Sequence, residues 1–158
     1  ARADYTWTRP NPRHLARGYY LPALRSEAMP PIVVVIDTSG SIDHVTLDQF
    51  AAEVNGIVDD ARPARTHVIY CDAAVQGEDI FEPGDQIVLT PKGGGGTVSA
   101  PALDYADALD EPPACIIYLT DLQIHHRAEP PAAPILWVAP TTGPDVPYGE
   151  VVTMEGER

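Results

Sequence analysis

The stretch Ile32-Val33-Val34-Val35-Ile36, followed at once by Asp37-Thr38-Ser39-Gly40-Ser41, decides the fold of this chain. Five consecutive β-branched residues are typical of a strand that is buried on both faces of a parallel sheet. Polar residues that follow such a strand emerge at its carboxyl end, which is the edge where open α/β sheets bind ligands. The stretch therefore predicts the central strand of a sheet and the edge that carries a site.

A helix is expected directly after this turn. Thr46 and Gln49 have the spacing of a capping box, with Val45 and Phe50 as its hydrophobic staple, so we expect the helix to start there. Apolar residues then recur at helical spacing until about residue 61.

The rest of the chain continues the alternation of strands and helices. Ser99 and Pro101 are typical of a second helix start, and that helix is expected to end near Asp110. Short β-like pieces at 74–75, 79–81 and 86–89 predict an antiparallel edge hairpin. Further strands are expected at residues 66–71, 114–119, 135–138 and 150–153. The predicted fold class is an α/β, doubly wound, mostly parallel sheet, in which residues 120–134 are too few for more than a shortened helix or a bare loop.

The composition limits the class of protein and of partner. The chain has 158 residues, 44% hydrophobic and 21% charged, which is the composition of an ordinary globular domain. No apolar run approaches the ~18 residues of a membrane span, so no membrane partner is expected. The net charge is −13, and residues 1–30 carry five arginines against two acids, so the remainder carries −16. Such a surface repels nucleic acid and attracts cations, although it also serves simple solubility.

Two further expectations concern domain organisation and compartment. Residues 1–30 mix aromatic residues, prolines and arginines without a period and are expected to form an arm or linker, whereas residues 31–158 form the domain. Cys71 and Cys115 border apolar strands that flank the central strand on opposite sides, so we expect two buried free thiols. Free thiols suit a reducing compartment, and we expect a cytoplasmic protein.

Five oxygen-bearing side chains are expected to meet at the carboxyl edge of the sheet. Asp37, Ser39 and Ser41 follow the central strand, Asp121 follows the strand at 114–119, and Thr97 follows a run of four glycines. Two carboxylates and three hydroxyls suit Mg²⁺, Mn²⁺ or Ca²⁺ and disfavour zinc or copper. Because three of these ligands are neutral, the ion keeps positive charge and a position for an incoming carboxylate.

At these residues the sequence resembles the von Willebrand factor A (vWA) family, whose metal-ion-dependent adhesion site has an Asp-x-Ser-x-Ser motif, a distant Thr and a distant Asp. The resemblance covers roughly residues 31–153 and implies a Rossmann-like sheet with Asp37 and Asp121 on adjacent strands. The chain departs from the family at Leu122, where Gly is common, which leaves the shape of the loop beside the metal open.

A narrower resemblance is to vWA-like domains of uncharacterised bacterial proteins that follow a predicted metallopeptidase-like domain. It rests on residues 5–12, 20–22 and 134–138. It implies that the catalytic half lies in an upstream domain. No His-Glu-x-x-His motif occurs in these 158 residues, so no zinc peptidase role is assigned to this chain.

Several residues near the site have other interpretations. His125 and His126 suit a softer metal but are more often plain surface residues in such a loop. His44 is either a second layer around the metal or an exposed residue at a helix start, and Asp43 either orients a metal-bound water or stabilises a turn. Lys92 precedes the glycine run instead of following it, so the phosphate-binding P-loop pattern fails.

The leading functional hypothesis is a metal-dependent protein-binding module that presents Mg²⁺ to an Asp or Glu of a partner protein or of another domain of the parent chain. The chain itself is not expected to be an enzyme. The alternatives are a regulatory, non-catalytic half of a metallopeptidase-like protein and metal-assisted phosphate hydrolysis, for which no general base is evident. A phosphoaspartate mechanism at Asp37 and a Ser-His-Asp mechanism at Ser39 both lack their companion motifs.

Overall fold

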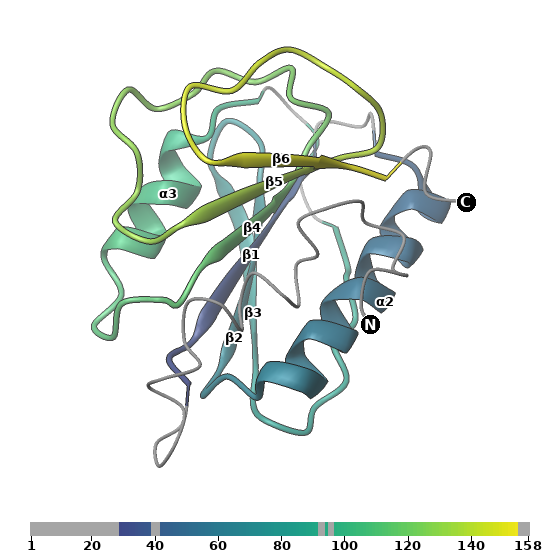
Figure 1. Cartoon of the computed structure of the whole chain (residues 1–158), viewed down its shortest axis with the longest axis vertical. Helices are drawn as coiled ribbons and strands as arrows, with labels where there is room; N and C mark the ends of the chain where they lie inside the picture. The colour runs from purple at the N-terminus through teal and green to yellow at the C-terminus, as the bar shows by residue number, and fades with distance from the viewer. Residues whose placement is uncertain (1–28, 39–41, 92–93, 95–96, 155–158) are drawn as a thin grey trace.

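The central strand of the sheet is β1 (Ile32–Asp37), as the sequence predicts (Figure 1). The computed structural model describes residues 29–38, 42–91, 94 and 97–154. The other strands are β2 (Thr66–Cys71), β3 (Val75–Phe81), β4 (Ile116–Leu119), β5 (Ile135–Ala139) and β6 (Glu150–Thr153). They form one six-stranded sheet in the order β3-β2-β1-β4-β5-β6.

The sheet is mostly parallel. β1 pairs in parallel with β2 and with β4, β4 with β5, and β5 with β6, whereas β2 and β3 pair antiparallel at one edge. The predicted α/β class with an antiparallel edge is therefore confirmed. The side chains of β1 are buried on both faces of the sheet, which explains why its residues are continuously apolar up to Asp37.

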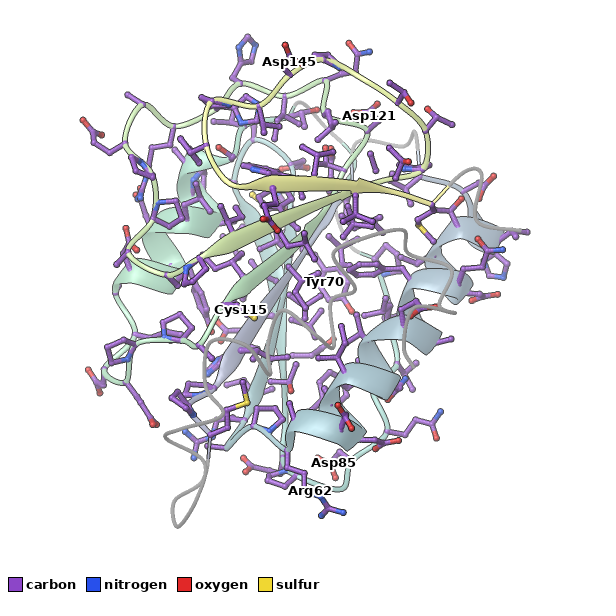
Figure 2. The ribbon with its side chains drawn as sticks, viewed as in Figure 1. Arg62, Tyr70, Asp85, Cys115, Asp121 and Asp145 are labelled. Atoms are coloured by element: carbon purple, nitrogen blue, oxygen red, sulfur yellow. The ribbon has the colours of Figure 1, made fainter. Side chains whose placement is uncertain are left out.

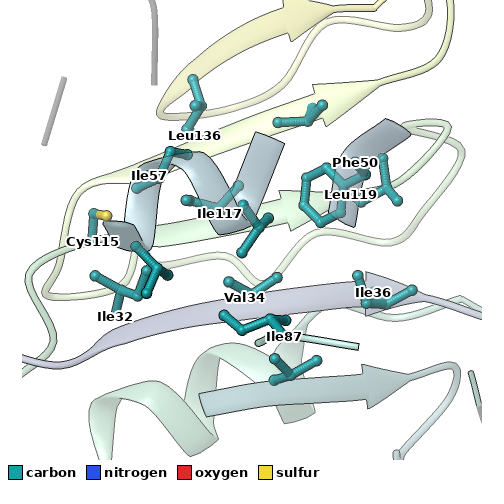
Figure 3. Close-up of a cluster of buried hydrophobic side chains, with 14 of the residues drawn as sticks. Ile32, Val34, Ile36, Phe50, Ile57, Ile87, Cys115, Ile117, Leu119 and Leu136 are labelled. Carbon is teal, nitrogen blue, oxygen red and sulfur yellow. The ribbon is translucent and has the colours of Figure 1, made fainter. Parts of the chain in front are cut away.

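One face of the sheet is covered by α2 (His44–Ala61), and Figure 3 shows the side chains between them. Alternate residues of β1 point to this face, because successive strand residues point to opposite sides. The helix contributes its periodic apolar residues, all buried. These residues are Leu47, Phe50, Val54, Ile57 and Val58.

The predicted start of α2 at Thr46 is wrong, because the helix begins before this residue. Asp43 is the N-cap, and its carboxylate accepts a hydrogen bond from the Thr46 backbone N–H at 2.8 Å. A carboxylate is a strong cap, so the cap lies at Asp43, three residues before the Thr46 cap that the capping box predicted. Val45 is 63% exposed and does not form the expected staple. The helix ends where predicted, with Arg62 in the left-handed conformation as its C-cap.

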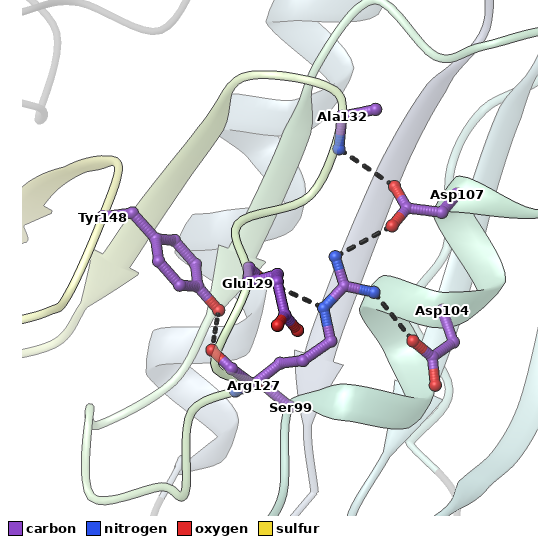
Figure 4. A network of polar contacts seen from close by, with 7 residues as sticks. All are labelled: Ser99, Asp104, Asp107, Arg127, Glu129, Ala132 and Tyr148. Carbon is purple, nitrogen blue, oxygen red and sulfur yellow. Dashed lines mark hydrogen bonds and ion pairs between the residues drawn. The ribbon is translucent and has the colours of Figure 1, made fainter.

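The other face is covered by α3 (Ala100–Asp107), which is three residues shorter than expected. Residues 120–134, between β4 and β5, contain no helix, so of the two expected alternatives the crossover is the bare loop. This loop is held by Arg127, whose guanidinium donates to Asp104 at 2.7 Å and to Asp107 at 2.8 Å (Figure 4). The Ser99 hydroxyl accepts the Arg127 backbone N–H and makes no helix cap.

The predicted antiparallel edge hairpin is formed by β2 and β3. β3 begins at Val75 and runs through the second expected piece at 79–81, whereas residues 86–89 form no strand. The backbone of Ile87 is instead hydrogen-bonded on both sides by the Asn55 side chain of α2, at 2.9 and 3.0 Å. A side chain thus satisfies the groups that a strand partner would have used.

The structure also tests the expectations for the cysteines, the N-terminal arm and membrane spans. Both cysteines are free and buried, on opposite sides of β1 as predicted. Met29, inside the predicted arm, is buried and forms a bridge with Pro63, and residues 1–28 lie outside the described residues. Within the described ranges, none of the helices has the length and apolar character needed to cross a membrane.

Candidate functional site

The carboxyl ends of β1 and β4 lie side by side and bring two acidic residues to one edge of the sheet. Asp37 is the last residue of β1, and Asp121 follows β4 by two positions. The hydroxyl of the intervening Thr120 donates a 2.6 Å hydrogen bond to the Asp37 carboxylate and accepts the backbone N–H of Leu122 at 3.1 Å. Asp37 and Thr120 are buried, so their side chains join the two strand ends beneath the surface.

Asp121 is half-buried at the start of the loop that follows β4. Its carboxylate accepts the Gln123 backbone N–H at 2.9 Å, which closes a tight turn. Leu122 adopts a φ of 72°, a conformation that glycine adopts freely and leucine adopts at a cost of about 1–2 kcal/mol. The loop therefore has the backbone shape of a glycine turn although it carries a leucine. Leu122 is 3% exposed, and burial of its side chain offsets the strain.

Thr97 lies between the residue that follows β2 and the loop that follows β4, held there through backbone hydrogen bonds. The Val98 N–H donates to the Asp72 carbonyl at 3.0 Å, and the His125 N–H donates to the Thr97 carbonyl at 3.2 Å. The segment at 97–99 is thus pinned between the end of β2 and the loop that carries Asp121. The side chain of Thr97 is half-buried.

Asp72 is a functional candidate that the sequence interpretation missed. It is 5% exposed and follows β2 directly, in the position that Asp121 nearly occupies after β4. Its carboxylate accepts the N–H of Gly94 at 3.0 Å, the N–H of Ala74 at 3.1 Å and the amide of Gln76 at 2.9 Å. Asp72 thereby contacts the chain on both sides of Thr97, at Gly94 through its carboxylate and at Val98 through its backbone carbonyl. Its place at a strand end was a signal that could have identified it.

The remaining predicted ligands, Ser39 and Ser41, lie outside the described residues. Thr38, next to them, donates its N–H to the Cys71 carbonyl at 3.1 Å. Its hydroxyl is buried and has no hydrogen-bond partner within the described part of the chain. A buried hydroxyl without a partner costs about 1–3 kcal/mol, so this edge favours a bound polar species nearby.

The residues at this edge fit a hard cation in their chemistry. The described members of the predicted set offer carboxylate and hydroxyl oxygens, which are the ligands of Mg²⁺, Mn²⁺ and Ca²⁺. The soft donor nearby is Cys71, and burial raises the pKa of its thiol to about 11, so it stays protonated. In the described ranges, no three side chains of His, Cys, Asp or Glu form a metal-binding group, and the predicted set contains two of that kind.

The neighbouring residues with open interpretations have distinct positions. Asp43 caps α2, so its role in the turn is accounted for, and His44 is exposed, 3.8 Å from Asp48. The expectation that His126 is a plain surface residue is wrong, because its ring packs edge-on against Trp137 at 4.9 Å. The backbone of His125 pairs with Val98 as described above.

Comparison with known proteins gives the family. The model of the VWA-like domain (DUF2201) family matches residues 32–155, which is most of the chain and contains all the predicted ligands. The chain belongs to this family. This VWA-like domain is also 32% identical, over 122 residues, to an uncharacterized protein of Thermotoga maritima. The match covers 75% of the chain and 30% of that relative, so the chain spans less than a third of the relative's length. No solved structure matches the domain significantly.

Proposed function

We propose that this VWA-like domain is a divalent-cation-dependent protein-binding module. In this proposal Asp37, Ser39, Ser41, Thr97 and Asp121 hold Mg²⁺, or Mn²⁺ or Ca²⁺ in its place. The cation binds an Asp or Glu of a partner protein or of another domain of the parent chain. The chain itself does not catalyse a reaction.

The observation that carries the proposal is the junction between β1 and β4. The Thr120 hydroxyl holds the buried Asp37 carboxylate at 2.6 Å, directly beside the strand end that carries Asp121. Two carboxylates brought to one edge repel each other unless a cation lies between or near them. The held carboxylate, the pinned Thr97 segment and the buried Thr38 hydroxyl all favour a cation at this edge.

The residues support binding better than catalysis. A bound cation supplies a positive charge with an unfilled coordination position, which a partner carboxylate can take. Catalysis would require an activated nucleophile or a general base at the same edge. The Cys71 thiol is protonated, because burial raises its pKa to about 11, and the Thr38 hydroxyl has no base beside it among the described residues.

The charge of the domain narrows the kind of partner. Residues 31–158 carry a net charge of −16, so the surface around the cation repels an approaching acid. Binding should therefore depend strictly on the metal. The Thermotoga maritima relative extends well beyond the matched region. This supports a partner domain within the same polypeptide, as expected for the regulatory half of a longer protein.

The first test is the thermal stability of the domain with and without metal. Millimolar Mg²⁺ or Mn²⁺ should raise the melting temperature, because a ligand at 100 times its dissociation constant adds about 2.7 kcal/mol to the free energy of unfolding. Asp37→Ala and Thr97→Ala should remove the increase. Thr97→Ala is the sharper variant, since Thr97 is pinned through backbone groups that the substitution leaves in place.

A charge-matched control separates a site from general screening. Asp110 is exposed and lies in the loop between α3 and β4, which leads into the amino end of β4 and not to its carboxyl end. Asp110→Asn should therefore keep the full metal effect. If all three variants respond to Mg²⁺ like the wild type, the cation acts diffusely on the acidic surface and the proposed site is wrong. Binding of an acidic partner, measured by calorimetry with the remaining parent domain, should disappear in EDTA.

A further inference from the structure

A pocket of about 420 Å³ lies beside the candidate metal edge, and we propose that it binds a lysine or arginine side chain of the partner. We name it the edge pocket. It is lined by Leu122, residues 142–146, Val151 and Thr153. The inference rests on the proposed function, because the same partner would supply the carboxylate for the cation.

The pocket exists because this part of the sheet has no helix over it. Val151 and Thr153 alternate with Val152, which points into the core under α2, so they face the α3 side of the sheet. On that side the crossover between β4 and β5 is a loop, and a second loop at 140–149 arches over the end of the sheet (Figure 1). Two loops leave a hollow where a helix would have filled the space.

The pocket adjoins the candidate site through direct contact. A Cβ at Gly143 would lie 3.0 Å from the Asp121 carbonyl oxygen and 3.4 Å from the Cβ of Leu122. Gly143 and Leu122 both line the edge pocket, so its inner wall is the residue that follows Asp121. Figure 2 shows Asp121 and Asp145 at the same end of the molecule. One partner segment can reach both.

The lining selects a long basic side chain. Its apolar part includes Leu122, Val146 and Val151, and Val151 is 37% exposed. Its charged member is the exposed carboxylate of Asp145, and the lining contains no Lys, Arg or His. Lysine and arginine place an apolar stem on such walls and keep a cationic head in water beside a carboxylate. A second acid of the partner would be repelled here, since Asp145 adds to the negative charge of the domain.

The pocket can be tested without the metal. N-acetyl-arginine methylamide is titrated into the ¹⁵N-labelled chain in EDTA, with the neutral citrulline derivative as the matched ligand. We expect saturable amide shifts at residues 142–146 and 151–153 for arginine and much weaker ones for citrulline. Asp145→Asn should weaken arginine binding by roughly fivefold, which corresponds to an exposed ion pair of about 1 kcal/mol. Asp59→Asn on α2, also exposed, should leave it unchanged.

Equal weakening by Asp145→Asn and Asp59→Asn, or equal binding of the citrulline derivative, would overturn the pocket. A second arm uses Mg²⁺ and acetylated tetrapeptides that carry Asp and Arg, or Asp and citrulline, separated by two glycines in either order. The arginine peptides should bind about fivefold tighter, and Asp145→Asn should abolish that advantage. Metal-dependent binding with no preference for arginine keeps the proposed function and refutes the pocket. Arginine binding in EDTA with no gain from Mg²⁺ keeps the pocket and refutes the metal site.

Discussion

The two faces of the sheet are covered by different kinds of structure. The α2 face is covered by one 18-residue helix whose buried residues contact alternate residues of β1. The α3 face also buries an apolar cluster, but it is covered by an eight-residue helix and two loops that polar contacts hold in place. The centre of those contacts is Arg127, whose side chain is 15% exposed and bridges two carboxylates of α3.

The difference shows where this fold has room for a binding function. A helix that packs along the sheet fills its face with apolar side chains and leaves little space. Loops cover a face incompletely, and here they leave the edge pocket open next to Asp121. Both faces bury apolar clusters, but the α3 face also carries the surface that a partner can reach.

The largest effect is expected on the α2 face. Phe50 is fully buried between α2 and the sheet, so Phe50→Ala should lower the free energy of unfolding by about 3–5 kcal/mol, through lost burial and a cavity. Urea denaturation followed by circular dichroism measures this. Val45→Ala, on the same helix but 63% exposed, should change stability by less than about 0.5 kcal/mol. Similar losses in both variants would show that α2 does not pack as described.

The next largest effect is expected for the ion pairs that hold the loop between β4 and β5 against α3. Arg127→Met keeps most of the side-chain volume but removes the ion pairs to Asp104 and Asp107, whose side chains are 67% and 34% exposed. Because these acids are partly solvated, we expect a loss of about 1–3 kcal/mol instead of the full cost of a buried pair.

Hydrogen exchange locates that loss. Faster exchange should be confined to the loop at 120–134 and to α3, with α2 unchanged. Arg65→Met is the control, since Arg65 is 47% exposed and lies 3.5 Å from Glu82, and it should cost less than about 1 kcal/mol. If exchange in α2 rises as much as in the loop, the two faces are not independent in the way described.

The two faces also differ in how far they could be predicted. The β1 stretch and the apolar period of α2 predicted their elements, because burial on a regular element imposes a period on the sequence. The loops of the α3 face have no period. The clamp made by Arg127 joins residues that are 20 and 23 positions apart, and no local pattern signals it.

The candidate site was predictable in part for the same reason. Asp37 and Asp121 were found because each follows an apolar strand, and the register of parallel strands brings such ends together. Asp72 occupies a similar strand-end position but is not part of the Asp-x-Ser-x-Ser, Thr and Asp motif. The role of Asn55 as a side-chain partner for Ile87 depends on tertiary contact alone.

A smaller effect is expected at Leu122, where the α3 face meets the candidate site. At ordinary positions Ala is more stabilising than Gly by about 0.5–1 kcal/mol, because Gly gains more entropy on unfolding. Leu122 has a φ of 72°, so this order should be reversed. Both variants lose the burial of the leucine side chain, but Leu122→Gly also relieves the backbone strain. It should therefore be more stable than Leu122→Ala by about 1 kcal/mol in urea denaturation. The usual order would show that the turn after Asp121 relaxes to a negative φ.

The smallest expected effect is a dependence on pH that belongs to the α3 face. Burial lowers the pKa of His67 below 6.5, and Arg65 lowers it further against the opposing charges of Glu78 and Glu82. Burial likewise lowers the pKa of His126, whose Nδ1 is buried and has no hydrogen-bond partner among the described residues. Both histidines contact aromatic side chains of the α3 face, His67 through Tyr105 and His126 through Trp137.

The sign of the dependence follows from which state binds the protons. Unfolded histidines take up a proton near pH 6.5, whereas the folded domain resists protonation at His67 and His126, so stability should fall as the pH drops from about 7 toward 5. The double variant His67→Gln, His126→Phe removes both titrating groups while it keeps a polar group at 67 and an aromatic ring at 126. Its urea midpoint should therefore change less between pH 7.5 and pH 5.5 than that of the wild type.

His44→Gln is the control, because the His44 side chain is 89% exposed on α2, and its variant should keep the wild-type dependence. If the control flattens the pH dependence as much as the double variant does, the acid sensitivity does not reside in the α3 face. The carboxylates are common to all three proteins, so the difference between the variants isolates the histidines.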